Sequence, residues 1–287
     1  MTNDMNKFFL VPSMLFSTVC ALGVMTSISN AQLPGTLSDG LVAYYSFNGN
    51  ANDSVGNLDG EVHGGVTTSS DRFGNPNSAY MFNGSNGVIG PASPLTYPFA
   101  LVSNSFTVSV WFQANQDDTL YPQSTDPTIR GHNFIVSPYW GGYGNGAGIG
   151  ISAGLNGISL TEQADRYFPT VLTFESSIGS GWVNAVFTVS NNQAPILFVN
   201  GNLAATGVYT GRDLSFAPFQ DTGNGVGGGG YGYFNGGIDD LAIWNTALSS
   251  TQVSDLYAAQ SVPEPSTYAL LLLSGAASLW ALRRRKS

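Results

Sequence analysis

Short segments in which apolar and polar residues alternate fill the chain between residues 33 and 260. Every second position from 41 to 47 is apolar, which is typical of a strand with one face toward a core. Residues 106–112, 183–189 and 195–207 are rich in β-branched and aromatic side chains, and clusters of Gly, Asn, Pro and Ser separate them. This pattern predicts an all-β domain built from many short strands.

Two local signals mark a turn and a helix in this region. Asn200-Gly201 lies between two apolar runs and predicts a tight hairpin, because both central residues of a type I′ turn need a positive φ. Helical periodicity begins only at residues 249–252, where Ser and Gln fit a capping box. The apolar face of that helix consists of Val253, Leu256 and Tyr257. We therefore expect one antiparallel β-sandwich, residues 33–260, closed by a single short helix.

The N-terminal residues 1–31 follow the order of regions found in secretory signal peptides. Lys7 precedes a long apolar stretch, and Ser29 and Ala31 are small residues that suit a signal peptidase. Cleavage after Ala31 removes Cys20, the only cysteine of the sequence, so disulfides are not expected to stabilise the mature protein. A buried N-terminal helix is the alternative interpretation.

The C-terminal end has three parts. Pro263-Glu264-Pro265 precede an apolar segment of residues 268–282. The chain then carries the basic residues Arg283, Arg284, Arg285 and Lys286. Fifteen helical residues extend roughly 22 Å against a hydrocarbon core of ~30 Å, so this segment predicts a marginal membrane span. The positive-inside rule places its basic end in the cytoplasm and the domain outside the inner membrane.

This three-part order resembles the PEP-CTERM sorting signal, here residues 261–287. In that family a membrane-embedded exosortase recognises and removes the tail, in Gram-negative bacteria that often make exopolysaccharide. The resemblance implies export through an inner-membrane intermediate to the cell envelope or the extracellular matrix. A permanent C-terminal membrane anchor is the alternative.

Charge is scarce along the chain and unevenly placed. Only 9% of the residues are charged, and the formal net charge is −9. Five of the nine basic residues lie in the two terminal segments, which leaves the body more acidic than the chain as a whole. Binding to a phosphate backbone requires Lys or Arg to displace counterions, so nucleic acid is excluded as an expected partner.

Four short motifs occur in order through the body, at residues 40–54, 72–84, 182–201 and 234–249. They resemble the laminin G-like group of the concanavalin A-like lectin/glucanase superfamily. The resemblance implies a jelly roll, that is, a sandwich of two curved sheets in which the first and last strands are neighbours.

Asp239 is the most informative carboxylate in these motifs. If its apolar neighbours face inward, alternation buries Asp239 and points Asp240 toward solvent. A buried carboxylate needs a partner, and the resemblance implies a Ca²⁺ site near the first motif, with Asp53, Asn57 and Asp239 as ligands. The alternative is that Asp239 accepts hydrogen bonds from backbone amides of that loop.

Catalytic patterns are absent from the sequence. Glucanases of this superfamily place carboxylates at alternate positions of one strand, whereas the close acid pairs here, at 117–118 and 239–240, are adjacent and predicted to point to opposite faces. His63 and His132 have no nucleophile motif beside them and are expected on the surface or in turns. We expect a protein that is not an enzyme.

Aromatic residues flanked by glycine offer a candidate sugar-binding surface, because glycine lets a sugar ring approach an aromatic face closely. The residues are Tyr139, Trp140, Tyr143, Tyr231 and Tyr233. Packing of these rings in the core is the alternative, and the glycine-rich run 223–232 is expected to be a flexible loop.

Together these observations predict an exported, non-catalytic binding or adhesion module associated with carbohydrate or surface matrix. Expected partners are signal peptidase, an exosortase-type enzyme and exopolysaccharide or a surface glycan. The alternative is a structural matrix or surface-coat protein without a ligand pocket, and a glycan-active hydrolase is the least favoured interpretation.

Overall fold

The computed structural model describes residues 35–95, 99–121, 131–141, 144–164, 168–220 and 224–262. The larger of its two main sheets contains β1 (Leu41–Tyr45), β3 (Val66–Ser69), β4 (Ala79–Asn83), β7 (Phe106–Ala114), β12 (Val183–Val189), β13 (Ile196–Val199), β14 (Asn202–Thr206) and β18 (Asn235–Trp244). Their order is β14-β13-β12-β7-β18-β4-β3, and β1 also pairs with β18. The predicted strands at 41–47, 106–112, 183–189 and 195–207 are thereby confirmed.

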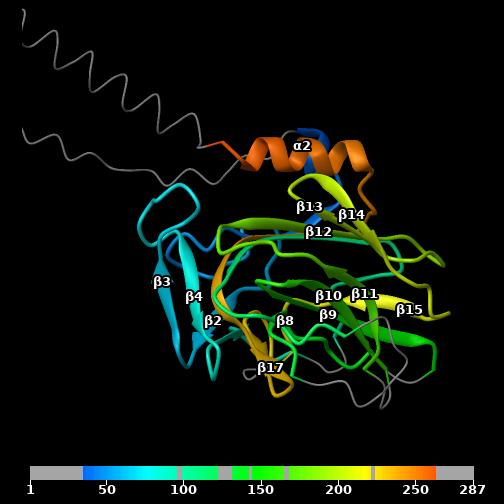
Figure 1. Ribbon diagram of the computed structural model, residues 1–287, viewed down its shortest axis with the longest axis horizontal. Helices are drawn as coiled ribbons and strands as arrows, with labels where there is room; N and C mark the ends of the chain where they lie inside the picture. Colours follow the sequence, from blue (N-terminus) through cyan, green and yellow to red (C-terminus); the bar gives the residue numbers. More distant parts are fainter. Residues whose placement is uncertain are drawn as a thin grey trace, which may run out of the picture.

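The smaller sheet lies beneath it in Figure 1. Its strands are β6 (Val102–Ser103), β8 (Phe134–Val136), β9 (Gly146–Gly154), β10 (Gly157–Gln163), β11 (Thr170–Glu175) and β15 (Asp213–Phe216). The order is β11-β10-β9-β15-β6, with β8 paired to β9. All these pairs are antiparallel except β15 with β9, so the predicted antiparallel sandwich is confirmed with one parallel pair.

Two short strand pairs extend the sandwich. They are β2 (Gly60–His63) with β5 (Val88–Pro91), and β16 (Gly228–Gly229) with β17 (Gly232–Tyr233). The second pair places part of the predicted flexible loop 223–232 in a hairpin.

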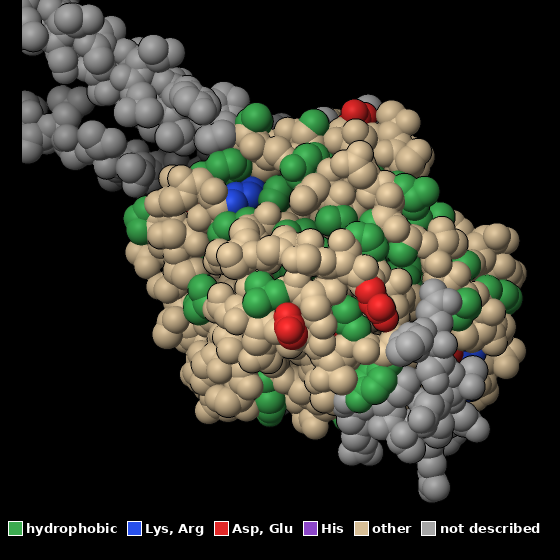
Figure 2. Space-filling view, viewed as in Figure 1, with side chains coloured by type: hydrophobic (Ala, Val, Ile, Leu, Met, Phe, Trp, Pro, Cys, Tyr) green, Lys and Arg blue, Asp and Glu red, His purple; other side chains and the backbone are tan. Residues whose placement is uncertain are grey.

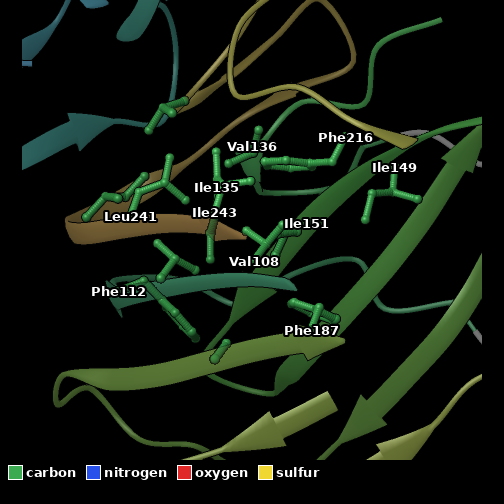
Figure 3. Packing of buried hydrophobic residues seen from close by; sticks show 14 of the residues in the cluster. Val108, Phe112, Ile135, Val136, Ile149, Ile151, Phe187, Phe216, Leu241 and Ile243 are labelled. Atoms are coloured by element: carbon green, nitrogen blue, oxygen red, sulfur yellow. The ribbon is translucent and has the colours of Figure 1, made fainter. Parts of the chain in front are cut away.

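The main core lies between the two large sheets. Val108, Phe187 and Ile243 from one sheet point toward Ile151 and Phe216 from the other (Figure 3), and all five are fully buried. Ala43, Tyr45 and Phe47 are also fully buried, as the alternation predicts. Apolar burial of this extent is the main stabilising contribution to the fold.

A second, smaller core lies on the outer face of the larger sheet. There α2 (Ser250–Gln260) covers the sheet (Figure 1) and packs Val253 and Leu256 against Phe198 and Trp244. Ser249 caps α2 with the predicted capping box. A four-residue helix, α1 (Gly35–Ser38), also packs here, so the expectation of a single helix was incomplete.

The chain ends of the described domain lie side by side. β1 pairs with β18, for example Tyr45 with Leu241, which confirms that the first and last long strands are neighbours. The predicted hairpin also forms, with φ of 49° at Asn200 and 75° at Gly201 between β13 and β14. Both signals are local in the sequence, which is why they could be recognised there.

The two terminal signals lie outside the described residues. These are the predicted signal peptide 1–31 and the Pro-Glu-Pro, apolar and basic parts of the tail from residue 263 onward. Among the residues described, no helix is both long and apolar enough for a membrane crossing.

Candidate functional site

Arg72 joins two adjacent carboxylates in a buried cluster between the loop after β3, β18 and α2. Its two terminal guanidinium nitrogens lie 2.9 Å from Asp239 Oδ2 and 2.8 Å from Asp240 Oδ2. The side chain of Arg72 is 8% exposed, and those of Asp239 and Asp240 are 3% and 8% exposed. The partner of Asp239 is therefore a guanidinium, which neither the calcium hypothesis nor the loop-amide hypothesis anticipated.

Aromatic and backbone groups complete the surroundings of Arg72. The guanidinium lies over the Trp111 ring, 4.4 Å from its centroid, and Arg72 Nε donates to the carbonyl oxygen of Gln260 at 3.0 Å. Trp111 Nε1 donates to Gln260 Oε1 at 3.0 Å, and the Tyr44 hydroxyl donates to Asp240. Gln260, the last residue of α2, is thus hydrogen-bonded to β7 and to the loop after β3.

A β-bulge explains why both carboxylates reach one arginine. The register of β18 against β7 shifts between Asp239 and Ala242, and Asp240 has a φ of 45°. A bulge interrupts the strict alternation of side chains along a strand. The expectation that Asp240 points to solvent is therefore wrong, because Asp240 is only 6% exposed.

Burial dominates the electrostatics of this cluster. It raises the pKa of Asp239 well above the ordinary value, the charge of Asp240 raises it further, and Arg72 opposes both effects. Burial and then Asp240 likewise raise the pKa of Tyr44, so its hydroxyl keeps the proton that it donates. The cluster is a buried network in which one arginine is shared by two carboxylates, and its hydrogen bonds connect β1, the loop after β3, β7, β18 and α2.

The three proposed calcium ligands have different surroundings. Asp53 Oδ1 accepts hydrogen bonds from the amides of Tyr44, Val55 and Gly56 at 3.0–3.1 Å, and Asp239 is held by Arg72. The Asn57 side chain is exposed. Within the described ranges, no group of three or more His, Cys, Asp or Glu side chains is arranged to hold a metal. Ca²⁺ takes six to eight oxygen ligands, so these three side chains alone would not complete a calcium site, and calcium binding stays a prediction.

Chelation should accordingly leave the stability of the protein unchanged. We expect the melting temperature in EDTA to equal that in excess CaCl₂, because amides and Arg72 already satisfy the carboxylates that calcium would need. Differential scanning calorimetry in the two buffers measures this directly. A melting temperature several degrees higher in CaCl₂ would contradict this expectation and support a bound calcium ion.

A second buried polar cluster was missed by the sequence analysis. Asp118 and His132 are 5% and 2% exposed, and Ser152 Oγ donates to Asp118 Oδ2 at 2.9 Å. His132 Nδ1 lies 3.2 Å from Ser152 Oγ and 3.5 Å from Asp118 Oδ2. The expectation that His132 lies on the surface is wrong, because only 2% of this residue is exposed.

This cluster contains the residue types of a nucleophilic triad in the wrong arrangement. In a triad the histidine bonds the serine through one ring nitrogen and the carboxylate through the other. Here both partners contact Nδ1 of His132, while Nε2 is buried and makes no hydrogen bond to any residue that the structure describes. Ser152 also bonds Ser159 at 2.7 Å, so the group is a packed polar layer on β9 and β10.

Glycines alternate with apolar residues along β9. Other segments of the chain cover the face of β9 on which these glycines lie. A Cβ atom at Gly148 would lie 2.0 Å from the Tyr139 carbonyl oxygen, and one at Gly150 would lie 2.6 Å from Pro138 N. At Gly154 it would lie 2.0 Å from Asp118 N. The glycines therefore allow two covering segments to lie directly on this face.

The five aromatic candidates lie in different surroundings. Tyr139 is 3% exposed and its hydroxyl contacts Ser215, so its ring is a core residue and offers no face to a sugar. Trp140, Tyr231 and Tyr233 are half-buried, and Tyr231 packs on Phe168 with ring centroids 4.5 Å apart. Tyr143 lies outside the described residues.

Comparison with known proteins gives two family matches. The concanavalin A-like lectin/glucanases superfamily matches residues 82–254, and the PEP-CTERM protein-sorting motif matches residues 261–286. No curated protein sequence matches the chain.

Solved structures with a similar fold include domain 4 of AbnA, a GH43 extracellular arabinanase from Geobacillus stearothermophilus, in complex with arabinotriose. Its identity is 23% and its TM-score 0.48, over 76% of this chain and 98% of that one. The receptor binding domain of botulinum neurotoxin D and the binding domain of serotype G have identities of 15% and 19%, both with a TM-score of 0.52. They match 77% of this chain, which spans about half of their length (53% and 51%). At these identities the likeness shows the fold alone.

Proposed function

We propose that this chain, which belongs to the concanavalin A-like lectin/glucanases superfamily and carries a PEP-CTERM sorting motif, is an exported surface module. In this proposal the module binds carbohydrate without cleaving it. The sorting motif indicates export along a Gram-negative cell envelope route. Carbohydrate as the ligand and the absence of catalysis are the parts that we propose beyond this export route.

The internal pairing of the buried carboxylates is the observation that carries the non-catalytic part. Glycosidases need two carboxyl groups that flank the scissile bond, ~5–10 Å apart. Here Asp239 and Asp240 share Arg72, Asp53 accepts backbone amides, and Asp118 is held by Asn133 and Ser152. These acids stabilise the fold and leave none of their number free to protonate a leaving group.

The surface composition supports a carbohydrate ligand. The face in Figure 2 is mainly uncharged, with a few scattered acidic side chains. Of the five aromatic candidates, Trp140, Tyr231 and Tyr233 are half-exposed, and the two tyrosines lie at the hairpin of β16 and β17. Aromatic rings with a polar tip are suited to contact both the apolar face and the hydroxyl groups of a sugar.

The sorting route supports the proposed partners. The match to the sorting motif begins at residue 261, directly after Gln260, which Arg72 and Trp111 hold against the domain. An exosortase-type enzyme would therefore act close to the folded surface, at the inner membrane. Delivery to the envelope or the extracellular matrix would then bring the domain to exopolysaccharide.

Affinity electrophoresis of the full-length protein tests this function. Gels that contain dextran, galactan or mannan should retard the wild type, and Tyr231→Ala should migrate faster than the wild type in the same gel. Leu203→Ala removes an exposed apolar side chain, 65% exposed on β14, and serves as the control that keeps wild-type retardation. Absence of retardation in every gel would instead support a structural coat protein.

A further inference from the structure

Three turns meet in a shallow hollow at one edge of the sandwich. They are the β6–β7 turn with Asn104, the β12–β13 turn with residues 190–193, and the β14–β15 connection with Tyr209. The empty volume is about 170 Å³, which includes the open mouth of the hollow. A hollow this shallow does not enclose a ligand, so it offers contacts to one face of a ligand only.

Backbone and side-chain hydrogen bonds hold these turns in place. Asn104 N donates to the carbonyl oxygen of Leu214 at 2.8 Å, and Asn191 N donates to Ser105 Oγ at 3.2 Å. The Tyr209 hydroxyl donates to Asn192 Oδ1 at 2.9 Å, which fixes the ring while 43% of the residue stays exposed. The hollow therefore has one aromatic wall whose orientation does not have to be ordered by a ligand.

Unused amides surround that wall. The side-chain amides of Asn104, Asn191 and Gln193 line the hollow, are exposed, and make no hydrogen bond to another residue of the described chain. Each amide offers two donors and one acceptor, which matches the paired donor and acceptor capacity of sugar hydroxyls. An aromatic ring for the sugar face and amides for its hydroxyls form a complementary set.

The charges at the hollow favour an uncharged sugar. Arg212 is directed toward Glu162, with Nε 3.6 Å from Oε1, and Asp213 adds an exposed carboxylate. The whole chain carries a net charge of −9, which repels an acidic polysaccharide at long range.

We propose that this hollow is a binding site for one neutral monosaccharide unit, with Tyr209 as the stacking residue and Asn104, Asn191 and Gln193 as hydrogen-bonding residues. It is separate from the Tyr231 surface, and it rests on the proposed function only in that its ligand is also a carbohydrate. Two separate contacts on one domain would strengthen attachment to a repeating polymer.

Titration of the ¹⁵N-labelled full-length protein with methyl glycosides of glucose, galactose, mannose and arabinose tests the hollow. The side-chain amide signal of Asn191, identified by its loss in Asn191→Asp, should shift saturably with at least one of these sugars. The shift should persist in Tyr231→Ala, and the affinity should fall about tenfold or more in Tyr209→Ala. Glucuronate should produce no saturable shift.

Three results would overturn this site. They are no saturable shift of Asn191 with any of the four sugars, an unchanged affinity in Tyr209→Ala, and a stronger response to glucuronate than to the neutral sugars. If the polysaccharide gels still retard the wild type and not Tyr231→Ala, the proposed function survives these results. If the gels also show no retardation, both proposals fail.

Discussion

Replacement of Arg72 by leucine should lower the free energy of unfolding by about 3–5 kcal/mol, because it leaves two buried carboxylates without their shared cation. It also removes the contact with Trp111 and the hydrogen bond to Gln260. In a domain of this size the melting temperature should fall by about 10 °C. Urea unfolding followed by tryptophan fluorescence measures the difference in the free energy of unfolding between the wild type and Arg72→Leu.

Matched variants separate the charge effect from lost packing. Asp239→Ala should cost about 1–3 kcal/mol, since Arg72 keeps Asp240 as a partner. The triple variant Arg72→Leu, Asp239→Asn, Asp240→Asn should be more stable than Arg72→Leu alone, because it contains no unpaired buried charge. An Arg72→Leu protein with wild-type stability would show that the two carboxylates do not depend on this arginine.

Gly148→Ala should destabilise the protein by about 3 kcal/mol, because the new methyl group would lie 2.0 Å from the Tyr139 carbonyl oxygen. The segment that covers β9 must then move outward, since β9 is fixed by strands on both sides. Thermal unfolding and increased amide exchange around Tyr139 would record the displacement. The test therefore probes whether the outer face of β9 is closed by the chain.

Gly181→Ala is the matched control for this substitution. A Cβ atom at Gly181 meets nothing within 4 Å, and the position precedes β12 on the surface. Alanine there should leave stability unchanged or raise it by about 0.4–1 kcal/mol through the unfolded chain. Equal behaviour of the two variants would mean that the covering segment does not rest on β9.

The sequence predicted features that depend on neighbouring residues. Alternation identified the strand at 41–47, the Asn200-Gly201 pair identified the hairpin, and Ser249 with Gln252 identified the start of α2. Each signal reflects backbone preferences within a few residues. The family resemblance supplied the stacking of the two sheets, which local patterns do not determine.

Features that depend on long-range contacts were predicted poorly. Arg72 and Asp239 are 167 residues apart, and only the folded chain brings them together. The bulge that turns Asp240 inward breaks the alternation on which its predicted exposure rested. His132 is buried through contacts with Asp118 and Ser152, which no spacing rule connects.

The buried ionisable residues thus stabilise the fold. The candidates for glycan binding are the half-exposed Trp140, Tyr231 and Tyr233 and the hollow lined by Asn104, Asn191 and Gln193. The sandwich would act as a rigid carrier whose acids hold its strands and its last helix in place. Its contacts with glycan would be shallow, so attachment would depend on several weak contacts along a polymer.

We propose that this protein binds glycan without cleaving it, and one assay measures both binding and cleavage. Full-length protein is incubated with insoluble neutral polysaccharide, and the bound protein and the newly formed reducing ends are determined in the same sample. We expect saturable binding with no reducing ends above the protein-free background. Reducing ends that accumulate with time, and that disappear on substitution of a single carboxylate, would contradict it.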